Sequence, residues 1–386
     1  MLSINFTLFF RQLLKSFFRS RHTHYRLTVK RFSVLLAVMA VFFFSIAYHW
    51  LFFLLDVVFF SGFRRQKVEK PIFIIGNFRT GSTLLHRIMA RDTAHFVSFK
   101  MWEIYLAPSV SQRKFFRALL RLDALVGGPL RRFIGFFEKQ GIGRNRLHEM
   151  GMRKAEEEEG MLIFIWHSFW NRYFFPMPED TAPYDYFDSL MPRPKRRRIM
   201  RFYRRAVQRH LYYHDGGKML LSKNPCFTPK VRSLMEVFPD CRFIYLVRDP
   251  VDTCTSKVSW FAYWYNNFNS PLEPYPLKDE TIEMMKLWYT YPVEVLKHLP
   301  KKRALIVNYD DFVKSPENMI RFIYRSFGMK ITPDFDRVLV EETHRARSFK
   351  SSRETTAESI GMSKKILHER FEDIYAYYRN FRFDKP

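Results

Sequence analysis

The segment PIFIIGNFRTGSTLLHRIMARD, residues 71–92, constrains the fold more than any other part of the chain. It opens with a short apolar run after Pro71, rich in isoleucine, which is typical of a buried strand. After the loop, apolar residues recur at helical spacing. Gly76 and Gly81 allow a tight turn between the two elements, so that the first amides of the helix point toward an anion. The segment therefore predicts a strand, an anion-binding loop and a helix, in that order.

Three further segments have the length and composition of buried strands: residues 218–223, 242–247 and 303–309. Helix signals follow two of them. Thr228 and Pro229 have the chemistry of a helix start, and Ser315 and Gly328 are placed to begin and end another helix. Strands that alternate with helices predict a three-layer α/β fold with a mostly parallel sheet, in one domain that spans residues 70–386.

The loop GNFRTGST has the spacing of the phosphate-binding loop (P-loop) of kinases and NTPases, but Ser82 stands where those enzymes carry a lysine. In those enzymes the lysine reaches the β- and γ-phosphates, and the next hydroxyl holds magnesium. Here the cation is Arg79, inside the loop, which makes a triphosphate with its metal a poor fit. A sulfuryl group bridged to one phosphate carries less charge, and hydrogen-bond donors with one or two cations can stabilise its transfer without metal.

The same segment resembles the 5′-phosphosulfate loop of sulfotransferases that use 3′-phosphoadenosine 5′-phosphosulfate (PAPS). That loop usually reads G-x-x-R-S-G-T-T, and Thr80 and Ser82 replace its serine and threonine while keeping both hydroxyls. A second segment, YLVRDPVDTCTS, is similar to the family's 3′-phosphate site, where an arginine at a strand end is followed eight residues later by a serine. Arg248 and Ser256 hold these positions. For the arginine taken alone, the alternative is a helix cap or an ion pair with Asp249.

Three more segments resemble the family, residues 148–161, 220–240 and 307–329, so the resemblance covers roughly residues 70–380. It implies a P-loop-like fold, PAPS as the cosubstrate and no metal. It also implies which residues bind the cosubstrate: Arg79, Thr80, Gly81, Ser82, Thr83, Arg248 and Ser256.

The resemblance further implies three catalytic residues, Arg79, Lys223 and Glu103. Lys223 ends a predicted strand, where ligands of open α/β sheets bind, and with Arg79 it would stabilise the moving sulfuryl group. Glu103 stands 24 residues after Arg79 and would be the base that takes the proton of the acceptor hydroxyl. The alternative for Glu103 is a helix-start carboxylate or a surface ion pair.

Other titratable residues are weaker candidates. His148 and Glu149 are the second choice for the base or for acceptor binding. The run Glu156–Glu159 is expected to be mostly solvated, because adjacent carboxylates on a helix point in all directions, although one of them could face Arg79 or the acceptor. His86 has apolar neighbours and is expected to pack in the core.

Residues 34–60 are apolar and long enough for a helix that crosses the roughly 30 Å hydrocarbon layer of a membrane. They contain His49 and Asp56, however, and an ionisable group in lipid costs a few kcal/mol unless it is paired. The membrane-embedded segment, residues 33–63, is therefore either a single span or a hairpin that breaks near Ser45 to His49. Basic residues on both flanks favour the hairpin, because it leaves both flanks on the same side. Since the sulfuryl donor is made in the cytosol, the catalytic domain is expected on the cytosolic side.

Residues 1–32 form a basic, amphipathic segment. Arg11, Lys15 and Arg19 are four residues apart, which places them on one stripe of a helix whose other positions carry Leu and Phe. The pattern predicts an interfacial helix that is attracted to anionic lipid. The alternative is a helix packed on the protein's own core.

The formal charge of +26 favours anionic partners. The longest basic run, residues 193–205, can be a solvated or lipid-facing helix face, and without a nucleic-acid-binding signature no nucleic acid partner is expected. Three scattered cysteines argue against a disulfide scaffold or a structural zinc.

Taken together, the patterns predict a membrane-associated, PAPS-dependent sulfotransferase that acts on a hydroxyl group of an acceptor such as a lipid or a glycan. Two alternatives stay open. One is a P-loop kinase or NTPase, and the other is a membrane-anchored protein that binds the nucleotide without catalysis.

Overall fold

The computed structural model describes residues 4–137, 152–214, 216–273, 275–348 and 357–386. Its centre is a five-stranded sheet in the order β2-β3-β1-β4-β5, in which all neighbours pair in parallel. The strands are β1 (Ile72–Gly76), β2 (Phe96–Val97), β3 (Met219–Lys223), β4 (Arg242–Val247) and β5 (Ala304–Asn308). The parallel sheet confirms the predicted fold class, and β2 is the one strand of this sheet that the sequence did not predict.

Helices surround this sheet along the described chain. The α-helices are α1 (Phe6–Phe18), α2 (Val29–Phe59), α3 (Ser82–Met89), α4 (Met101–Tyr105), α5 (Val110–Leu125), α6 (Pro129–Phe137), α7 (Asn171–Phe174), α8 (Pro178–Asp185), α9 (Phe187–Leu190), α10 (Arg193–Tyr213), α11 (Val231–Val237), α12 (Pro250–Phe268), α13 (Lys278–Leu296), α14 (Tyr309–Lys314), α15 (Pro316–Ser326), α16 (Pro333–Ser348), α17 (Lys364–Arg370) and α18 (Glu372–Tyr378). Short 3-10 helices are η1 (Ser61–Arg65), η3 (Glu158–Ile165), η4 (Pro225–Lys230) and η5 (Glu358–Ile360).

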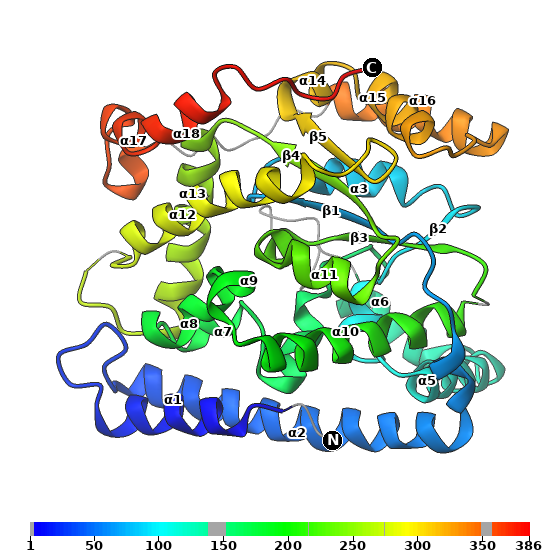
Figure 1. Ribbon diagram of the computed structural model, residues 1–386. Coiled ribbons are helices and arrows are strands. Elements are labelled where there is room, and N and C mark those ends of the chain that lie inside the picture. Colours follow the sequence, from blue (N-terminus) through cyan, green and yellow to red (C-terminus); the bar gives the residue numbers. More distant parts are fainter. Residues whose placement is uncertain (1–3, 138–151, 215, 274, 349–356) are drawn as a thin grey trace.

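The sheet is the middle one of three layers. Successive side chains of a strand point to opposite faces, so Ile72 and Ile74 pack with α3 and α15, whereas Phe73 and Ile75 pack on the opposite face. Figure 1 shows α3, α15 and α16 above the sheet, and α10 and α11 below it. Burial on both faces explains why the strand segments read as continuous apolar runs.

Two predicted helix starts differ in detail. The segment expected to begin at Thr228 begins earlier, at η4, where the Asn224 side chain accepts a hydrogen bond from the Cys226 amide at 3.0 Å. The Thr228 hydroxyl instead bonds the backbone of Gly76. Helix α15 begins at Pro316 as predicted, but the Ser315 side chain makes no capping hydrogen bond with the described residues.

Helices α1 and α2 lie side by side along one edge of the molecule (Figure 1). Helix α2 is continuous from Val29 to Phe59, so the hairpin break predicted near Ser45 to His49 is wrong. Its 31 residues, with a mean hydropathy of 2.1, meet the length and apolarity that a membrane crossing requires.

The N-terminal helices share the hydrophobic core of the rest of the chain. The rings of Phe9 in α1 and Phe42 in α2 each lie 4.7 Å from the ring of Trp166, measured between centroids. Leu13 and Leu35 belong to the same buried cluster as Phe73 of the sheet. The packing therefore joins α1 and α2 to the α/β domain.

Candidate active site

The glycine loop after β1 is held in a strained, closely packed form. Gly76 has φ +150°, and a Cβ there would lie 2.6 Å from the carbonyl oxygen of Leu246. Gly81 has φ +77°, and a Cβ there would lie 2.6 Å from the ring of Tyr309. Both positions therefore require glycine. The buried Thr80 hydroxyl closes the loop by donating to the Asn77 carbonyl oxygen at 2.9 Å.

The loop ends at the start of α3, where Gly81 is the N-cap and no side chain of the described residues bonds the first amides. The first amides of a helix lack partners within the helix, and they carry the positive end of its dipole. Ser82 is the first residue of the helix, and the exposed Thr83 follows. This end of α3 can therefore accept an anionic group.

Three predicted cosubstrate residues contact one another at the ends of β1 and β4. The Arg79 Nε donates to the Ser256 Oγ at 3.0 Å, and the Arg248 guanidinium donates to the Arg79 carbonyl oxygen at 3.0 Å. Arg79 adopts a left-handed backbone conformation with φ +66°, which is costly for a residue with a side chain and is found mainly at functional sites. The structure thus brings Arg79 of the glycine loop together with Arg248, which follows β4, and Ser256 on α12, which are 169 and 177 residues further along the chain.

The two arginines form a site of concentrated positive charge. Packing around the Arg79 guanidinium, followed by the charge of Arg248, lowers the pKa of Arg79. The Arg248 guanidinium lies over the ring of Tyr309, 4.5 Å from its centroid, and pairs with Asp252 at 3.2 Å. Asp249 instead caps α12 through the amides of residues 251 and 252. Tyr309, which the sequence analysis missed, thus packs against both the loop glycine and Arg248.

Lys223 is buried at the end of β3, with 3% of its surface exposed. Its Nζ lies 2.6 Å from the Glu157 Oε1. Burial alone would lower the pKa of Lys223, but the carboxylates of Glu157 and Glu156 raise it, so the ammonium is charged. Lys223 also lowers the pKa of His86, which burial has already lowered, to about 3. His86 is therefore a neutral core residue, as the sequence predicted.

The acidic run Glu156–Glu159 is not a solvated surface, which corrects the sequence-based expectation. The Glu158 carboxyl accepts a hydrogen bond from Ser222 at 3.0 Å, and Glu159 pairs with Lys230 at 2.9 Å. Glu158, Glu159 and Lys230 are all buried. The run therefore packs on β3 and η4 and supplies Lys223 with its carboxylate partner.

The pH dependence of stability should report on Glu158. Burial raises its pKa from 4.5 to about 8, so the folded protein keeps a proton that the unfolded chain releases as the pH rises through this range. The group therefore destabilises the fold progressively with rising pH. Glu158→Gln, a neutral side chain of the same shape, should gain stability relative to the wild type by up to about 1.4 kcal/mol per pH unit in this range. Denaturant unfolding at several pH values measures this, with the exposed Glu236→Gln as control. Parallel curves for Glu158→Gln and the wild type would contradict the assignment.

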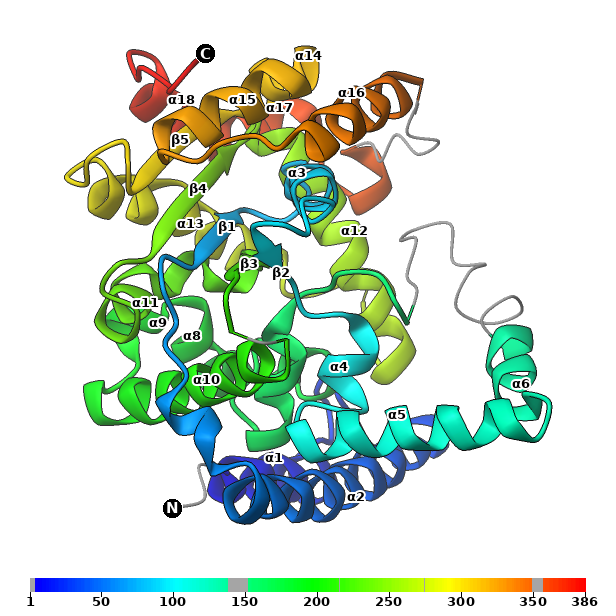
Figure 2. The same ribbon diagram turned by 90° about the vertical axis from the view of Figure 1, so that its right-hand side faces the viewer.

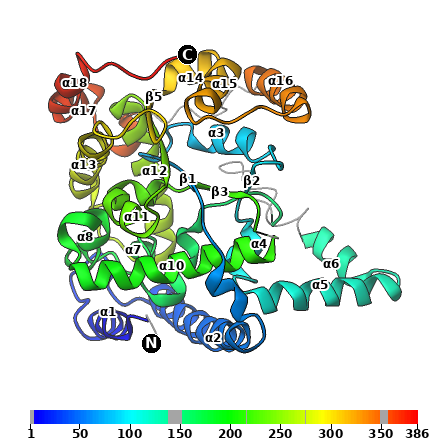
Figure 3. The same ribbon diagram turned by 45° about the vertical axis from the view of Figure 1, so that its right-hand side comes forward.

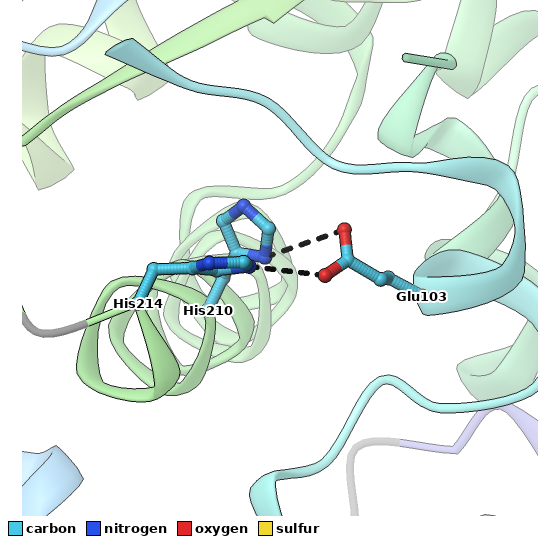
Figure 4. A group of neighbouring side chains, drawn as sticks. All are labelled: Glu103, His210 and His214. Atoms are coloured by element: carbon cyan, nitrogen blue, oxygen red, sulfur yellow. Dashed lines mark hydrogen bonds and ion pairs between the residues drawn. The ribbon is translucent and has the colours of Figure 1, made fainter. Parts of the chain in front are cut away.

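Glu103 is surrounded by hydrogen-bond donors and positive charges, and Figure 4 shows it beside His210 and His214. It is 1% exposed, and its carboxylate accepts hydrogen bonds from the Lys100 amide at 2.8 Å and from His214 at 3.0 Å, with the Arg113 guanidinium at 3.8 Å. Burial alone would raise the pKa of Glu103, but Arg113, His210 and these hydrogen bonds hold it well below its usual range. Such a carboxylate is a weak base.

None of the contacts found for Glu103 among the described residues involves Arg79, Lys223 or Arg248. They match the helix-start and ion-pair alternative, with the ion pair buried rather than at the surface. A catalytic role for Glu103 stays a prediction without support from these contacts.

Glu103, His210 and His214 are the one group of three possible metal ligands found in the described part of the chain, with donor atoms within 4.8 Å of one another. The Arg113 guanidinium donates to the His210 Nδ1 at 2.9 Å, so that lone pair is already used. The positive charge of Arg113 also neutralises Glu103 and would repel a divalent cation. We therefore assign no metal to this group.

Lys257, next to Ser256, is a further buried cation that the sequence analysis missed. Its Nζ lies 2.7 Å from the centroid of the Phe78 ring in the glycine loop and 3.6 Å from that of Phe261, and it has no hydrogen-bond partner in the described part of the chain. Burial lowers the pKa of this amine well below its usual value. Lys257 thus packs α12 against the loop.

Two predicted features lie outside the described residues. They are His148 and Glu149, the second choice for the base or for acceptor binding.

Comparisons with known proteins identify the family and the fold. A profile of the sulfotransferase family matches residues 71–334. Two curated relatives, the omega-hydroxy-beta-dihydromenaquinone-9 sulfotransferases Stf3 of Mycobacterium bovis and Mycobacterium tuberculosis, are each 24% identical over 277 residues. These alignments cover 68% of this chain and 63% of each relative, so the chain spans less than two thirds of the curated relatives' length.

Two solved structures share the fold. Sulfotransferase STF1 from Mycobacterium tuberculosis superposes with a TM-score of 0.63 at 21% identity, over 81% of this chain and 79% of that one. Sulfotransferase STF9 from Mycobacterium avium superposes with a TM-score of 0.64 at 16% identity, over 84% of this chain and 80% of that one.

Proposed function

Since the chain belongs to the sulfotransferase family, we propose that it transfers the sulfuryl group of PAPS to a hydroxyl group of a lipid at a membrane surface. The observation that carries this proposal is the cluster of Arg79, Arg248 and Ser256 beside the uncapped start of α3. Two guanidinium groups, a hydroxyl and free helix amides form a surface that binds phosphate.

The cosubstrate would contact both the residues that follow β4 and the glycine loop that follows β1. Ser256 and Arg248 would donate to the 3′-phosphate, and Arg79 would turn from Ser256 toward the 5′-phosphosulfate. The amides and hydroxyls of the segment from Thr80 to Thr83 would hold the remaining oxygens of that group. The dense positive charge favours a nucleotide that carries two anionic groups, the 3′-phosphate and the 5′-phosphosulfate.

Sulfuryl transfer then needs charge stabilisation and a base. The acceptor oxygen attacks sulfur, the bond between sulfur and the phosphate-bridging oxygen breaks, and 3′,5′-adenosine bisphosphate leaves with the electron pair. The acceptor proton passes to a base. Lys223 and Arg79 supply positive charge for the oxygen on which negative charge develops.

We assign the base to Glu157, with Glu103 as the alternative. Glu157 accepts a hydrogen bond from Lys223 at 2.6 Å, which places a carboxylate beside the lysine proposed to act on the sulfuryl group, and its side chain is 13% exposed. When Lys223 turns to the bridging oxygen, the Glu157 carboxylate is free to accept a proton. Glu103 is nearly fully buried and already accepts hydrogen bonds on both oxygens.

Two observations support a lipid as the acceptor. The curated relatives are named for a menaquinone, which is a lipid. The chain also carries the long apolar helix α2, which supports an association with membranes. Because PAPS is made in the cytosol, we propose that the catalytic site faces that compartment.

The proposal is tested by incubating the full chain with PAPS labelled in the sulfuryl group and an extract of membrane lipids. We expect mass spectrometry to find a lipid that has gained one sulfuryl group. Lys223→Ala should abolish this product, whereas Lys218→Ala, an exposed lysine just before the same strand, should keep it. Magnesium-dependent ATP turnover would favour a kinase or NTPase instead. Tight binding of 3′,5′-adenosine bisphosphate without any sulfated product would favour a nucleotide-binding protein without catalysis.

A further inference from the structure

Helix α2 presents a continuous apolar face away from the domain. The residues it buries recur at three-, four- and seven-residue spacing along one stripe: Arg31, Leu35, Phe42, His49, Phe53 and Asp56. Its exposed large side chains are Val29, Phe32, Leu36, Val41, Phe43, Phe44, Leu51, Leu54, Val58 and Phe59. No charged residue occurs between Phe32 and Phe59 except the buried Asp56, so the outer face is apolar over about 40 Å.

Helix α1 extends this face. Its exposed residues Phe6, Phe10, Leu14 and Phe18 are four positions apart and therefore share one stripe. The ring of Phe10 lies 6.3 Å from that of Phe43 on α2, which makes the two stripes contiguous.

The basic stripe of α1 does not face lipid as predicted. Arg11 pairs with Asp180 at 2.5 Å, and Lys15 pairs with Glu179 at 2.7 Å, both on α8. Two of the three residues of the basic stripe therefore pair with the protein, whereas Arg19 and the apolar side of α1 are exposed.

Helix α5 adds a third strip, as Figures 2 and 3 show it beside α2 at the same edge of the molecule. The ring of Phe115 lies 6.2 Å from that of Phe52 on α2, and Phe115, Leu122 and Leu125 are exposed. We call the exposed apolar residues of α1, α2 and α5 the membrane face. Soluble monomers rarely expose an apolar surface of this extent.

Basic clusters flank the membrane face at both ends of α2. At the start, Arg21, His22 and Arg26 line a hollow of about 420 Å³ together with Phe17 and Phe18. This end combines exposed arginines with exposed rings, which suits an anionic group at the edge of an apolar layer.

At the other end of α2, the Arg205 guanidinium on α10 donates to the Arg64 carbonyl oxygen at 3.3 Å, and Arg201 and Arg204 lie on the same helix. Partial burial and then the charges of the other three arginines lower the pKa of Arg205. No ion pair joins Arg64, Arg201 or Arg204 to a carboxylate within the described ranges. Charge complementarity therefore identifies the partner as a lipid surface with anionic headgroups.

The buried stripe of α2 argues against a transmembrane span. The Asp56 carboxylate accepts hydrogen bonds from the Val110 and Ser111 amides at 3.0 and 2.7 Å, and from Arg209 at 2.8 Å. Arg31 donates to the carbonyl oxygens of Phe174 and Phe268. A span would carry these groups into hydrocarbon and leave Arg209 buried without its carboxylate.

We propose that the membrane face lies in the plane of an anionic membrane, with α2 parallel to the bilayer surface and the basic clusters on the headgroups. This inference rests on the proposed membrane association and specifies its geometry. An in-plane helix buries its apolar side about 5–10 Å into the boundary between headgroups and acyl chains.

Depth-dependent fluorescence quenching tests this geometry. Single cysteines at Leu36, Phe44, Leu51 and Val58, on the exposed side of α2, carry an environment-sensitive dye. The three native cysteines are buried. Vesicles of phosphatidylcholine and phosphatidylglycerol contain quenchers at defined depths. We expect the same shallow depth at all four positions, and no quenching at Val313, an exposed apolar residue on α14.

Other outcomes would overturn the inference. A depth that is greatest at Phe44 and shallow at both ends would establish a transmembrane span. Absence of quenching together with a dimer in solution would identify the face as an interface between copies of this chain. If neither quenching nor a dimer is found, the proposal that this face binds a membrane is wrong. Binding of 3′,5′-adenosine bisphosphate in detergent, measured in parallel, tests the proposed reaction separately from the geometry.

A separate measurement tests whether the basic clusters bind anionic headgroups. Arg201→Gln and Arg204→Gln should each weaken binding to these vesicles by roughly fivefold, and binding to pure phosphatidylcholine should change little. An equal affinity of the wild type for both kinds of vesicle would contradict the assignment of the basic clusters.

Discussion

Replacing Glu157 by glutamine is expected to slow sulfuryl transfer by about a hundredfold or more, while the affinity for 3′,5′-adenosine bisphosphate stays within a few-fold. Glutamine keeps the size of the side chain but cannot take the proton of the acceptor. The residues proposed to bind the nucleotide, Arg79, Arg248 and Ser256, are unchanged in this variant. Steady-state turnover and calorimetric affinity, measured on the same preparation, separate the two effects.

Two matched variants test whether the effect belongs to Glu157. Glu156→Gln removes the adjacent carboxylate, whose pKa is raised mainly by burial, and should reduce turnover much less. Glu103→Gln leaves Arg113 buried without its charge partner, which should cost about 3–5 kcal/mol of stability. Turnover per nucleotide-binding molecule should then stay near normal. If Glu103→Gln abolishes turnover in a folded protein and Glu157→Gln does not, Glu103 is the base.

Arg248→Ala is expected to abolish the discrimination between nucleotides that carry a 3′-phosphate and those that lack one. The wild type should bind 3′,5′-adenosine bisphosphate much more tightly than adenosine 5′-monophosphate, without magnesium, because Arg248 and Ser256 donate to the additional phosphate. A charge-assisted hydrogen bond contributes about 1.5–3 kcal/mol, so the variant should lose roughly tenfold to a hundredfold in affinity for the bisphosphate alone.

Net charge must be controlled, because the whole surface attracts anions. Arg337→Ala removes one positive charge from an exposed arginine that pairs only with Asp334 in the described contacts, and it should leave both affinities unchanged. Equal affinity of the wild type for the two nucleotides would remove the basis for the 3′-phosphate site.

The sequence was sufficient for features whose signals are local. The loop glycines, the strand ends and the spacing of Arg248 and Ser256 each depend on a few neighbouring residues, and the predicted strands and the parallel sheet are confirmed. Strand β2 was missed because two residues, Phe96 and Val97, give no periodic pattern.

The acidic run was misread because its partners are distant in sequence. Lys223 and Lys230 are 66 and 71 residues from the carboxylates that they pair with. A run of four glutamates without those partners would be solvated. Glu103 is a similar case, since His210, His214 and Arg113 come from other helices and decide whether its carboxylate is free.

The hairpin was predicted on the assumption that lipid would surround His49 and Asp56. In the structure both side chains face the domain instead, where Gln112 forms a hydrogen bond with His49 and Arg209 donates one to Asp56. Leu35, Phe42, His49 and Asp56 are each seven residues apart, a spacing that would have indicated a helix with one packed side.

The docking of α2 through Asp56 also determines the order in which a newly made chain can mature. The partners of this carboxylate lie 54, 55 and 153 residues further along the polypeptide, so at roughly 5–20 residues per second the helix emerges from the ribosome many seconds before Arg209 exists. During that interval α2 is an apolar segment that targeting factors and chaperones can bind. Its packing against α5 and α10 therefore has to wait until α10 has been made, so the polar stripe of α2 stays uncovered during the early part of synthesis.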